Sequence, residues 1–313
     1  MHPTGGYYKI KKAIKEREGV SMYKSKKYFY TYEDYDEGDK NGKTLLEDIM
    51  NDSEFAGLEE IVIGCWGECW DPADAEDGAQ AIIDGIVANK DKFAHIKSLF
   101  VGDMDFEECE VSWIVQANYS KLWAAMPQLE KLVVKGSCDL SLGEISSDSL
   151  KHLEIICGGL PASVIKEIQN AKTPNLETLL LYLGVEDYGF DAEPADLENL
   201  LSGSDFPKLS YLGLTDSENQ NEIAEMILNS KYISQITTLD LSNGTLTDEG
   251  GQLLLDKILE YPNIKELNLE YHFMSEEMMD KLEALEGVDV CVDDPQEADE
   301  YDGEVYYYPM LTE

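Results

Sequence analysis

The chain has 313 residues, 43% of them hydrophobic, and a formal net charge of −40. This hydrophobic content is enough for a substantial folded core, which excludes a purely disordered acidic chain. The charge would repel a nucleic-acid backbone or an anionic lipid surface over most of the molecule, so we expect neither nucleic acid nor membrane as a partner.

The sequence shows no signal for export or for membrane insertion. No stretch approaches the roughly 20 apolar residues that span a bilayer, and the N-terminus lacks the apolar region of a secretory signal. The 6 cysteines are too sparse for a disulfide scaffold in a chain of this length. These features predict a cytoplasmic protein with free thiols.

The first 57 residues precede the regular part of the sequence. Residues 23–33 are rich in aromatic side chains that favour strands. We interpret 1–57 as an N-terminal cap and lead-in segment that covers the open end of the core.

The segment 37–48 has several features of a calcium-binding loop. Its residues at loop positions one, three, five, six and twelve are Glu37, Asp39, Asn41, Gly42 and Asp48. A calcium loop normally has Asp at the first position and a bidentate Glu at the twelfth, and no clear helix precedes this segment. A polar turn is therefore the favoured interpretation, with calcium binding as the alternative.

From residue 58 onward, the pattern L-x-x-L-x-L, with Ile or Val allowed, recurs at a mean spacing of about 29 residues. The copies begin at Leu58, Ile96, Leu129, Leu150, Leu176, Leu209, Ile236 and Ile264. Prolines that mark helix-to-strand corners lie two residues earlier at Pro127, Pro174, Pro207 and Pro262. The spacing suits one short strand and one helix per repeat.

Amphipathic segments of helical period lie between the predicted strands. The clearest are 79–93, 113–125, 195–202, 219–230, 249–260 and 275–286. Thr247 and Ser275 are placed as N-caps, since acidic residues follow each of them.

These elements predict an α/β leucine-rich-repeat solenoid of about eight repeats. Its parallel β-sheet would line the concave face of a horseshoe, with the helices on the convex face. The solenoid would span 58–287. Residues 288–313 would hold capping strands, within VDVCV and EVYYYP, and an acidic tail.

Several segments resemble known repeat proteins. TLDLSNGTLTDEG at 238–250 resembles the ribonuclease-inhibitor class of leucine-rich repeats. Further stretches resemble a family of bacterial cytosolic leucine-rich-repeat proteins without an assigned function, and they lie at 63–68, 99–114, 158–161, 206–214 and 238–250. The resemblance implies the same fold over about 58–300, and it supplies no catalytic residues.

In L-x-x-L-x-L the leucines point inward, so the alternating positions face the concave surface. The first six repeats place an apolar and aromatic strip there, and the last two place polar and acidic side chains. The residues predicted to bind a partner are Val62, Phe100, Val133, Leu180, Tyr182, Tyr211, Asp240, Glu266, Asn268 and Glu270. Aromatic anchors within an apolar strip indicate a protein interface, although cross-strand packing alone is the other interpretation.

The cysteines of CWGECWD, Cys65 and Cys69, are followed later by Cys109. Structural zinc sites normally use C-x₂-C with a second ligand pair, and no such pair follows. We therefore interpret these thiols as small hydrophobic residues in a loop, with metal binding as the alternative.

Motifs of enzymes are absent from the sequence. It contains no Walker loop, dinucleotide-binding glycine motif, H-E-x-x-H or nucleophile elbow. His152 and Cys157 share a repeat, but positions three and eight of one strand lie too far apart for a base and its nucleophile. We expect neither catalytic residues nor a cofactor.

Taken together, these patterns predict a scaffold that binds a partner protein, with a basic surface, on the concave face. Phe100, Tyr182 and Tyr211 would be the anchors, while Asp240, Glu266 and Glu270 would complement the partner's charge. A metal- or calcium-binding protein is the alternative, an enzyme is not expected, and the oligomeric state stays open.

Overall fold

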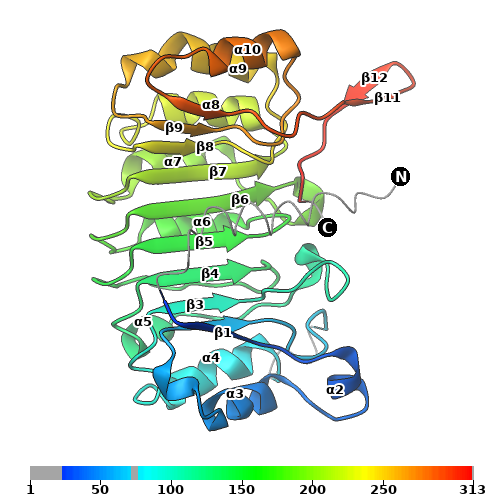
Figure 1. Ribbon diagram of the computed structural model, residues 1–313, viewed down its shortest axis with the longest axis vertical. Helices are drawn as coiled ribbons and strands as arrows, with labels where there is room; N and C mark the ends of the chain where they lie inside the picture. The colour runs from blue at the N-terminus through cyan, green and yellow to red at the C-terminus, as the bar shows by residue number, and fades with distance from the viewer. Residues whose placement is uncertain (1–22, 72–76, 312–313) are drawn as a thin grey trace.

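Each of the predicted repeat strands lies in one parallel sheet of the computed structural model, which describes residues 23–71 and 77–311 (Figure 1). Within these residues the sheet has ten strands in chain order, each parallel to the next. They are β1 (Ser25–Tyr28), β2 (Glu60–Ile63), β3 (Ser98–Val101), β4 (Lys131–Lys135), β5 (His152–Ile156), β6 (Thr178–Gly184), β7 (Tyr211–Ser217), β8 (Thr238–Asp240), β9 (Glu266–Asn268) and β10 (Asp289–Cys291). This sheet fits a leucine-rich-repeat-like fold.

The sheet separates two apolar regions because side chains alternate between its faces. In β6, Leu179 and Leu181 are buried in the main core, whereas Leu180 and Tyr182 belong to a second cluster on the opposite face. The repeat leucines therefore form the core between the sheet and the helices, and burying each one contributes roughly 2 kcal/mol.

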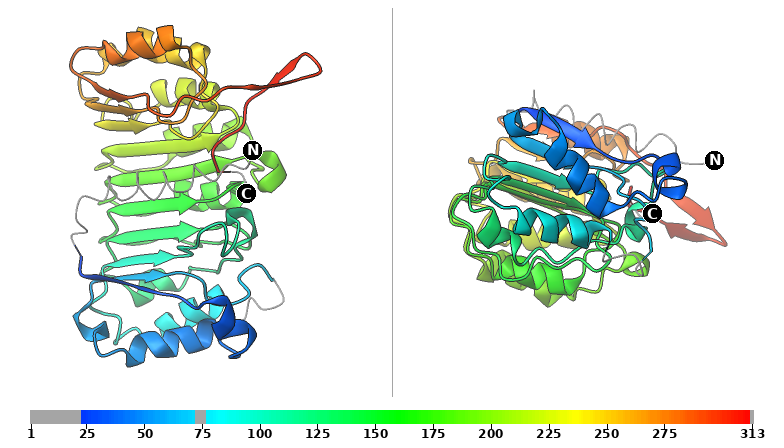
Figure 2. Two further views of the ribbon diagram at one scale, coloured as in Figure 1. Left: turned by 45° about the vertical axis from the view of Figure 1, so that its right-hand side comes forward. Right: turned by 90° about the horizontal axis from the view of Figure 1, so that it is seen from below.

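The helices follow the strands in order and cover one face of the sheet (Figures 1 and 2). They are α4 (Ala79–Ala88), α5 (Leu122–Ala125), α6 (Ala162–Gln169), α7 (Pro194–Gly203), α8 (Gln220–Leu228), α9 (Asp248–Lys257) and α10 (Glu276–Glu283). The predicted N-caps are confirmed, since the Thr247 hydroxyl accepts from the Glu249 N–H and the Ser275 hydroxyl from that of Met278.

The predicted helix over 113–125 is mostly wrong. Only Leu122–Ala125 is α-helical, and a 3₁₀ turn, Val111–Trp113, precedes it. Between them the side-chain amide of Gln116 donates to the carbonyl of Lys135 at 2.7 Å and its oxygen accepts from the Tyr119 hydroxyl at 2.8 Å. These buried bonds hold an extended backbone and compensate for the lost helical bonds.

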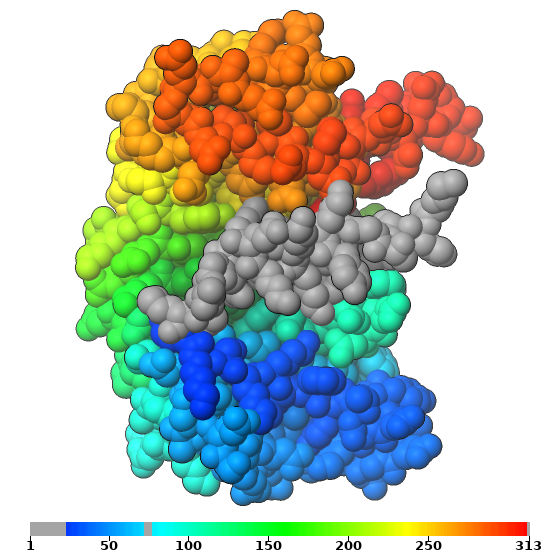
Figure 3. Space-filling model, viewed as in Figure 1, coloured from blue at the N-terminus to red at the C-terminus, as the bar shows by residue number. Residues whose placement is uncertain are grey.

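The ends of the described chain extend the sheet and then leave it. At one end, α2 (Tyr32–Asp36) and α3 (Gly42–Asn51) follow β1, and α3 packs on α4. At the other end, β11 (Asp299–Tyr301) and β12 (Glu304–Tyr306) form an antiparallel hairpin that stands out from the body (Figures 1 and 3). Thus β10, from VDVCV, continues the main sheet, whereas β12, from EVYYYP, pairs with β11 in a separate two-stranded sheet.

Candidate functional site on the front face of the sheet

The face of the sheet away from the helices (Figure 1) is here called the front face, and one row of residues crosses it from strand to strand in continuous register. The row through β2 to β9 is Val62, Phe100, Val133, Glu154, Leu180, Gly213, Asp240 and Asn268. The register thus brings together side chains up to 206 residues apart in sequence, as the predicted strand alternation requires.

An apolar cluster occupies the front face around β4, β5 and β6. Its buried members are Val111, Val133, Ile156, Leu180, Tyr182 and Leu311, with Phe100, Tyr211 and Met310 partly buried against them. The predicted exposure of Val133, Leu180 and Tyr182 is therefore wrong, since these residues are only 3%, 5% and 2% exposed. The sequence pattern assigned them to the right face without revealing that the chain itself packs over them.

The covering residues include the C-terminal segment, residues 307–311. The Met310 N–H donates to the carbonyl of Asn243 at 2.8 Å, and the Leu311 N–H donates to Oδ1 of Asp216 at 2.8 Å. Earlier in the same segment, the carbonyl of Tyr308 accepts from the Tyr271 hydroxyl at 3.0 Å. A segment of irregular backbone is therefore held by its own backbone groups, while the Leu311 side chain enters the apolar cluster.

Asp216, near the end of β7, is the buried charge-bearing group beside this segment. It has 0% exposure and a left-handed φ of 57°, which is unusual for a residue other than glycine. Burial raises its pKa well above the usual range of an aspartate, and hydrogen bonding by the backbone of Leu311 and Met310 opposes that shift. Its second oxygen, Oδ2, has no hydrogen-bond partner among the described residues.

The other half of the front face, around β7 to β9, is polar and internally bonded. Asp240 is buried, and its carboxylate accepts from the Tyr211 hydroxyl, from the Ser242 N–H and hydroxyl, and from the side-chain amide of Asn268. Its predicted exposure is therefore wrong, and these donors already solvate the carboxylate inside the protein.

Several of the predicted binding residues keep accessible surface. These are Val62, Phe100, Tyr211, Glu266, Asn268 and Glu270. Glu266 is exposed, and the others are half-buried. Acidic side chains on the front face are thus presented near β9, at one side of the polar half.

Sequence reasoning missed five residues of this site: Val111, Ile156, Asp216, Met310 and Leu311. Ile156 occupies the seventh position of its repeat, which the strand alternation places on the same face as the residues predicted to bind a partner. The apolar pair Met310 and Leu311, directly after Pro309 in an acidic region, was the only local signal for the covering segment. Nothing local distinguished Asp216 from the other acidic residues.

The backbone of 37–48 contradicts the alternative of a calcium loop, and it limits the favoured polar turn to the residues before α3. Asn41 caps α3 and Gly42 begins it, so the last seven positions of the supposed loop are helical. The Asp48 carboxylate accepts from the Tyr30 hydroxyl at 2.6 Å and from the Lys40 ammonium at 3.0 Å instead of facing the other acids. No group of three or more His, Cys, Asp or Glu suited to a metal occurs in the described parts of the chain.

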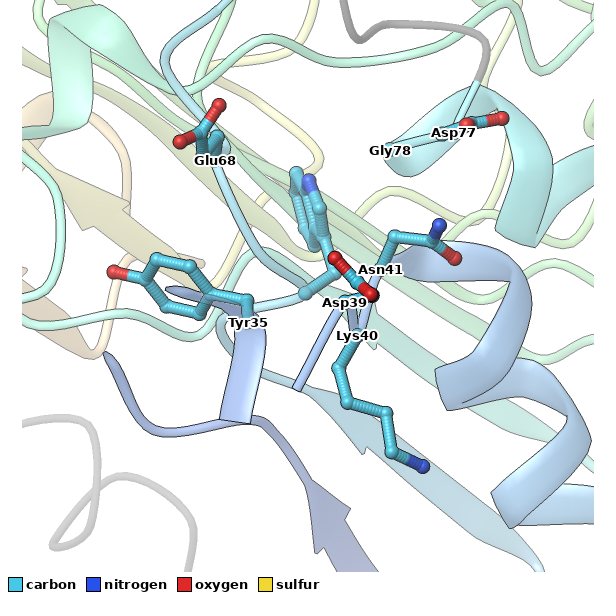
Figure 4. Close-up of a pocket in the computed structure, with 8 residues that line it drawn as sticks. Tyr35, Asp39, Lys40, Asn41, Glu68, Asp77 and Gly78 are labelled. Atoms are coloured by element: carbon cyan, nitrogen blue, oxygen red, sulfur yellow. The ribbon is translucent and has the colours of Figure 1, made fainter. Parts of the chain in front are cut away.

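A pocket of about 310 Å³ lies beside this helix start. It is lined by Tyr35, Asp39, Lys40, Asn41, Trp66, Glu68, Asp77 and Gly78. Figure 4 shows the Lys40 side chain directed away from the carboxylates of Glu68 and Asp77, which lie at separate points around the pocket. Its polar groups do not converge on one point, as a specific ligand site would require.

The three cysteines proposed as an alternative metal site are buried in the main core. Cys65, Cys69 and Cys109 are free thiols, and Cys69 hydrogen-bonds with both of the others. Hydrogen bonds with these neighbouring thiols, together with burial, raise the pKa of Cys69, which keeps it protonated. Protonated thiols in an apolar setting pack as small hydrophobic groups.

His152 and Cys157 have separate partners. The imidazole Nε2 of His152 lies 2.9 Å from Oε2 of Glu154 on the front face, while the thiol of Cys157 donates to the carbonyl of Tyr182 at 3.3 Å. Burial raises the pKa of Cys157 to about 12, so the thiolate that a nucleophile requires is disfavoured.

One solved structure is closely similar to this chain. It is the crystal structure of a protein from Bacteroides fragilis, which aligns over 93% of this chain and 84% of that chain at 40% sequence identity and a TM-score of 0.81. The chain belongs to the same family as this Bacteroides fragilis protein. No protein-family model and no curated protein matches the sequence.

A second solved structure is distant. An internalin from Listeria monocytogenes aligns over 82% of this chain and 89% of that chain, at 13% identity and a TM-score of 0.30. An alignment this weak carries no argument about the present chain.

Proposed function

We propose that this chain is a scaffold that binds an extended segment of a partner protein on the front face of its sheet. One observation carries the proposal: this face already holds a segment of irregular backbone, supplied by the chain's own residues 307–311. Met310 and Leu311 contribute backbone donors and apolar side chains to that contact. Backbone bonds for affinity and side-chain pockets for specificity are the usual means of recognising extended peptides.

The composition of the front face supports this function. Phe100 and Tyr211 are half-buried beside the apolar cluster, and partly accessible aromatic side chains are enriched among the residues that dominate binding energy. We propose these two residues as anchors, together with Tyr182 once the covering segment moves. No described group suggests chemistry beyond binding, and we propose a binding protein and not an enzyme.

The charge of the chain favours a partner with a basic surface. The net charge is −40, and Glu266 and Glu270 lie on the front face near β9. A field of this sign attracts a basic protein over distances near a Debye length and speeds its association. We expect electrostatics to control the association rate and the apolar cluster to control dissociation.

We infer a finer architecture as well. About eight repeats of the ribonuclease-inhibitor class would form a horseshoe whose concave surface is the front face. The eight motifs that coincide with β2 to β9 support this proposal, as does the TLDLSNGTLTDEG segment. Curvature would widen the surface available to a partner.

We also place the chain in the cytoplasm. The cysteines are all free, as expected in a reducing compartment. Across residues 23–71 and 77–311, every helix is too short or too polar to span a bilayer.

Photocrosslinking tests the scaffold function. A photoreactive amino acid at Phe100 reports contacts of the front face, and the same residue at Leu259 is the control, because Leu259 is 57% exposed beyond the end of α9. In lysate of the source organism, the Phe100 position should capture one dominant protein that the Leu259 position does not. Equal capture at both positions, or none at Phe100, would rule out binding at this face.

A further inference from the structure

The contact between residues 307–311 and the front face is small and local. Tyr307 and Tyr308 are 42% and 54% exposed, so only the side chains of Met310 and Leu311 enter the apolar cluster. The Tyr307 ring also packs edge-on against Phe273, with 5.1 Å between the ring centroids. A contact with two apolar side chains and a few hydrogen bonds is weak enough to open without unfolding the sheet.

The hairpin that leads to this segment gives it room to move. Within the described residues, β11 and β12 pair with each other and not with the main sheet, and they stand away from the body (Figures 1, 2 and 3). Tyr301 and Val305 of this hairpin are 71% and 54% exposed. An isolated two-stranded hairpin is marginally stable, so it restrains the segment only loosely when the segment leaves the front face.

Asp216 indicates what the front face would hold in place of this segment. Its carboxylate is fully buried, its backbone has a strained left-handed φ, and Oδ1 accepts the Leu311 N–H. The second oxygen has no hydrogen-bond partner within the described residues. A buried acceptor without a donor is costly, and strained, unsatisfied groups concentrate at ligand sites. A second donor beside the backbone N–H would satisfy this group better than the chain's own segment does.

We propose that residues 307–311 are an intramolecular ligand that must leave the front face before a partner binds. The partner would bring an extended segment with an aliphatic side chain for the apolar cluster and a backbone N–H for Oδ1 of Asp216. An ammonium or guanidinium group of the partner would reach Oδ2. The inference rests on the proposed scaffold function and specifies its partner chemistry and its regulation.

The charge of the molecule agrees with this partner chemistry. A lysine or arginine beside the aliphatic side chain would be attracted by the net charge of −40 and would pair with a carboxylate that the covering segment leaves half satisfied. The chain's own segment has the aliphatic residue and the backbone donor but no basic side chain between Tyr307 and Leu311. It is therefore a poorer ligand that its covalent attachment keeps in place.

A full-length variant with Leu311→Asp tests the inference, because a charged side chain cannot remain in the apolar cluster. The matched control is Tyr308→Asp, which adds the same charge to the same segment at an exposed position. The probe is a fluorescent, amide-ended peptide that copies residues 305–311, VYYYPML. It should bind the Leu311→Asp variant at least about tenfold more tightly than the native chain, since release raises the binding-competent fraction. The Tyr308→Asp variant should bind it as the native chain does.

Hydrogen exchange on the native chain provides a test that does not depend on the variant's folding. Saturating probe peptide should remove the protection of the Leu311 amide, which the bond to Asp216 otherwise provides. Equal affinity of the probe for the native chain and the folded Leu311→Asp variant would overturn the inference, as would continued protection of Leu311 at saturation.

The outcomes separate this inference from the scaffold function. A natural partner that crosslinks at Phe100 while the Leu311 amide stays protected would overturn the intramolecular ligand and leave the scaffold intact. A probe that displaces the segment, in a protein with no partner crosslinked at Phe100, would support the intramolecular ligand and count against the scaffold.

Discussion

The two halves of the front face satisfy their side chains in different ways. Around β4 to β6, Val133, Leu180 and Tyr182 are apolar or aromatic and are packed in a cluster with Leu311 from a distant segment. Around β7 to β9, Tyr211, Asp240 and their neighbours bond to one another within the sheet. An apolar surface is removed from water only when another segment packs over it. A polar network can form all of its hydrogen bonds within the sheet and needs no such segment.

This difference assigns different roles in binding to the two halves. Under the proposed scaffold function, a partner would gain free energy from the apolar half only after it replaced residues 307–311, so that half would set affinity and regulation. The polar half changes little on binding, and its accessible acids, Glu266 and Glu270, would set the approach and orientation of the partner. Four predictions test this division, beginning with the largest expected effect.

Truncation inside the apolar half should have the largest effect on stability. Tyr182→Ala removes a side chain that is 2% exposed and should lower the free energy of unfolding by about 3 kcal/mol. Urea denaturation followed by circular dichroism measures this change. Tyr308→Ala is the control at an exposed tyrosine and should cost less than about 0.5 kcal/mol. Similar losses at both positions would show that the cluster is not packed as a core.

Removal of the central acceptor should have the next largest effect, in the polar half. Asp240→Ala leaves the donors of Tyr211, Ser242 and Asn268 without their acceptor and should cost about 2 kcal/mol of unfolding free energy. Asp240→Asn keeps one carbonyl oxygen and should cost less, by the same urea measurement. If Asp240→Ala were neutral, water would already be satisfying these donors, and the polar half would be open to solvent.

The strands of this fold were predictable because their signal is local. Leu179 and Leu181 occupy fixed positions in a repeating motif, and period-two alternation then places Leu180 and Tyr182 on the opposite face. The predicted helix over 113–125 was mostly wrong because Gln116 forms buried bonds with Lys135 and Tyr119, which no periodicity records.

The packing of residues 307–311 over the candidate site was not predictable from such a local signal. Leu311 donates a hydrogen bond to Asp216, which lies 95 residues away in the sequence, and neither residue belongs to a motif that predicts this contact. The assignment of side chains to a face depends on neighbours in the chain, but their exposure depends on whatever packs on that face. The same reasoning explains Asp240, whose charge was read as accessible although its donors come from β7 and β9.

The contact between residues 307–311 and the front face should depend on pH, and this effect should be smaller than the loss of stability from either truncation. Burial raises the pKa of Asp216 well above that of an unfolded aspartate, about 3.9. Docking of residues 307–311 is therefore most favourable below the unfolded pKa and weakens as pH rises through the raised value, because the buried carboxyl must then be charged. The neighbouring ionisable groups, Cys157 and Tyr271, have pKa values raised to about 12 and stay neutral in this range.

The protection of the Leu311 amide in the native chain, measured by hydrogen exchange from pH 5 to 8 and corrected for the intrinsic exchange rate, should fall a few-fold as pH rises. Asp216→Asn keeps an acceptor for the Leu311 N–H but removes the titration, so its profile should be flat. A native profile as flat as that of Asp216→Asn, or protection that rises with pH, would contradict a pH-sensitive contact between residues 307–311 and the front face.

The smallest effect on stability should come from the accessible acids of the polar half. Glu266→Gln together with Glu270→Gln should change the free energy of unfolding by less than about 0.5 kcal/mol. The double variant should nevertheless slow association with a captured basic partner a few-fold at low salt, and the difference should disappear at high salt, as surface plasmon resonance would measure. Glu276→Gln, at an exposed site at the start of α10, is the control for loss of charge elsewhere. If Glu276→Gln slowed association as much per charge, net charge alone would attract the partner, and the front face would have no part in its approach.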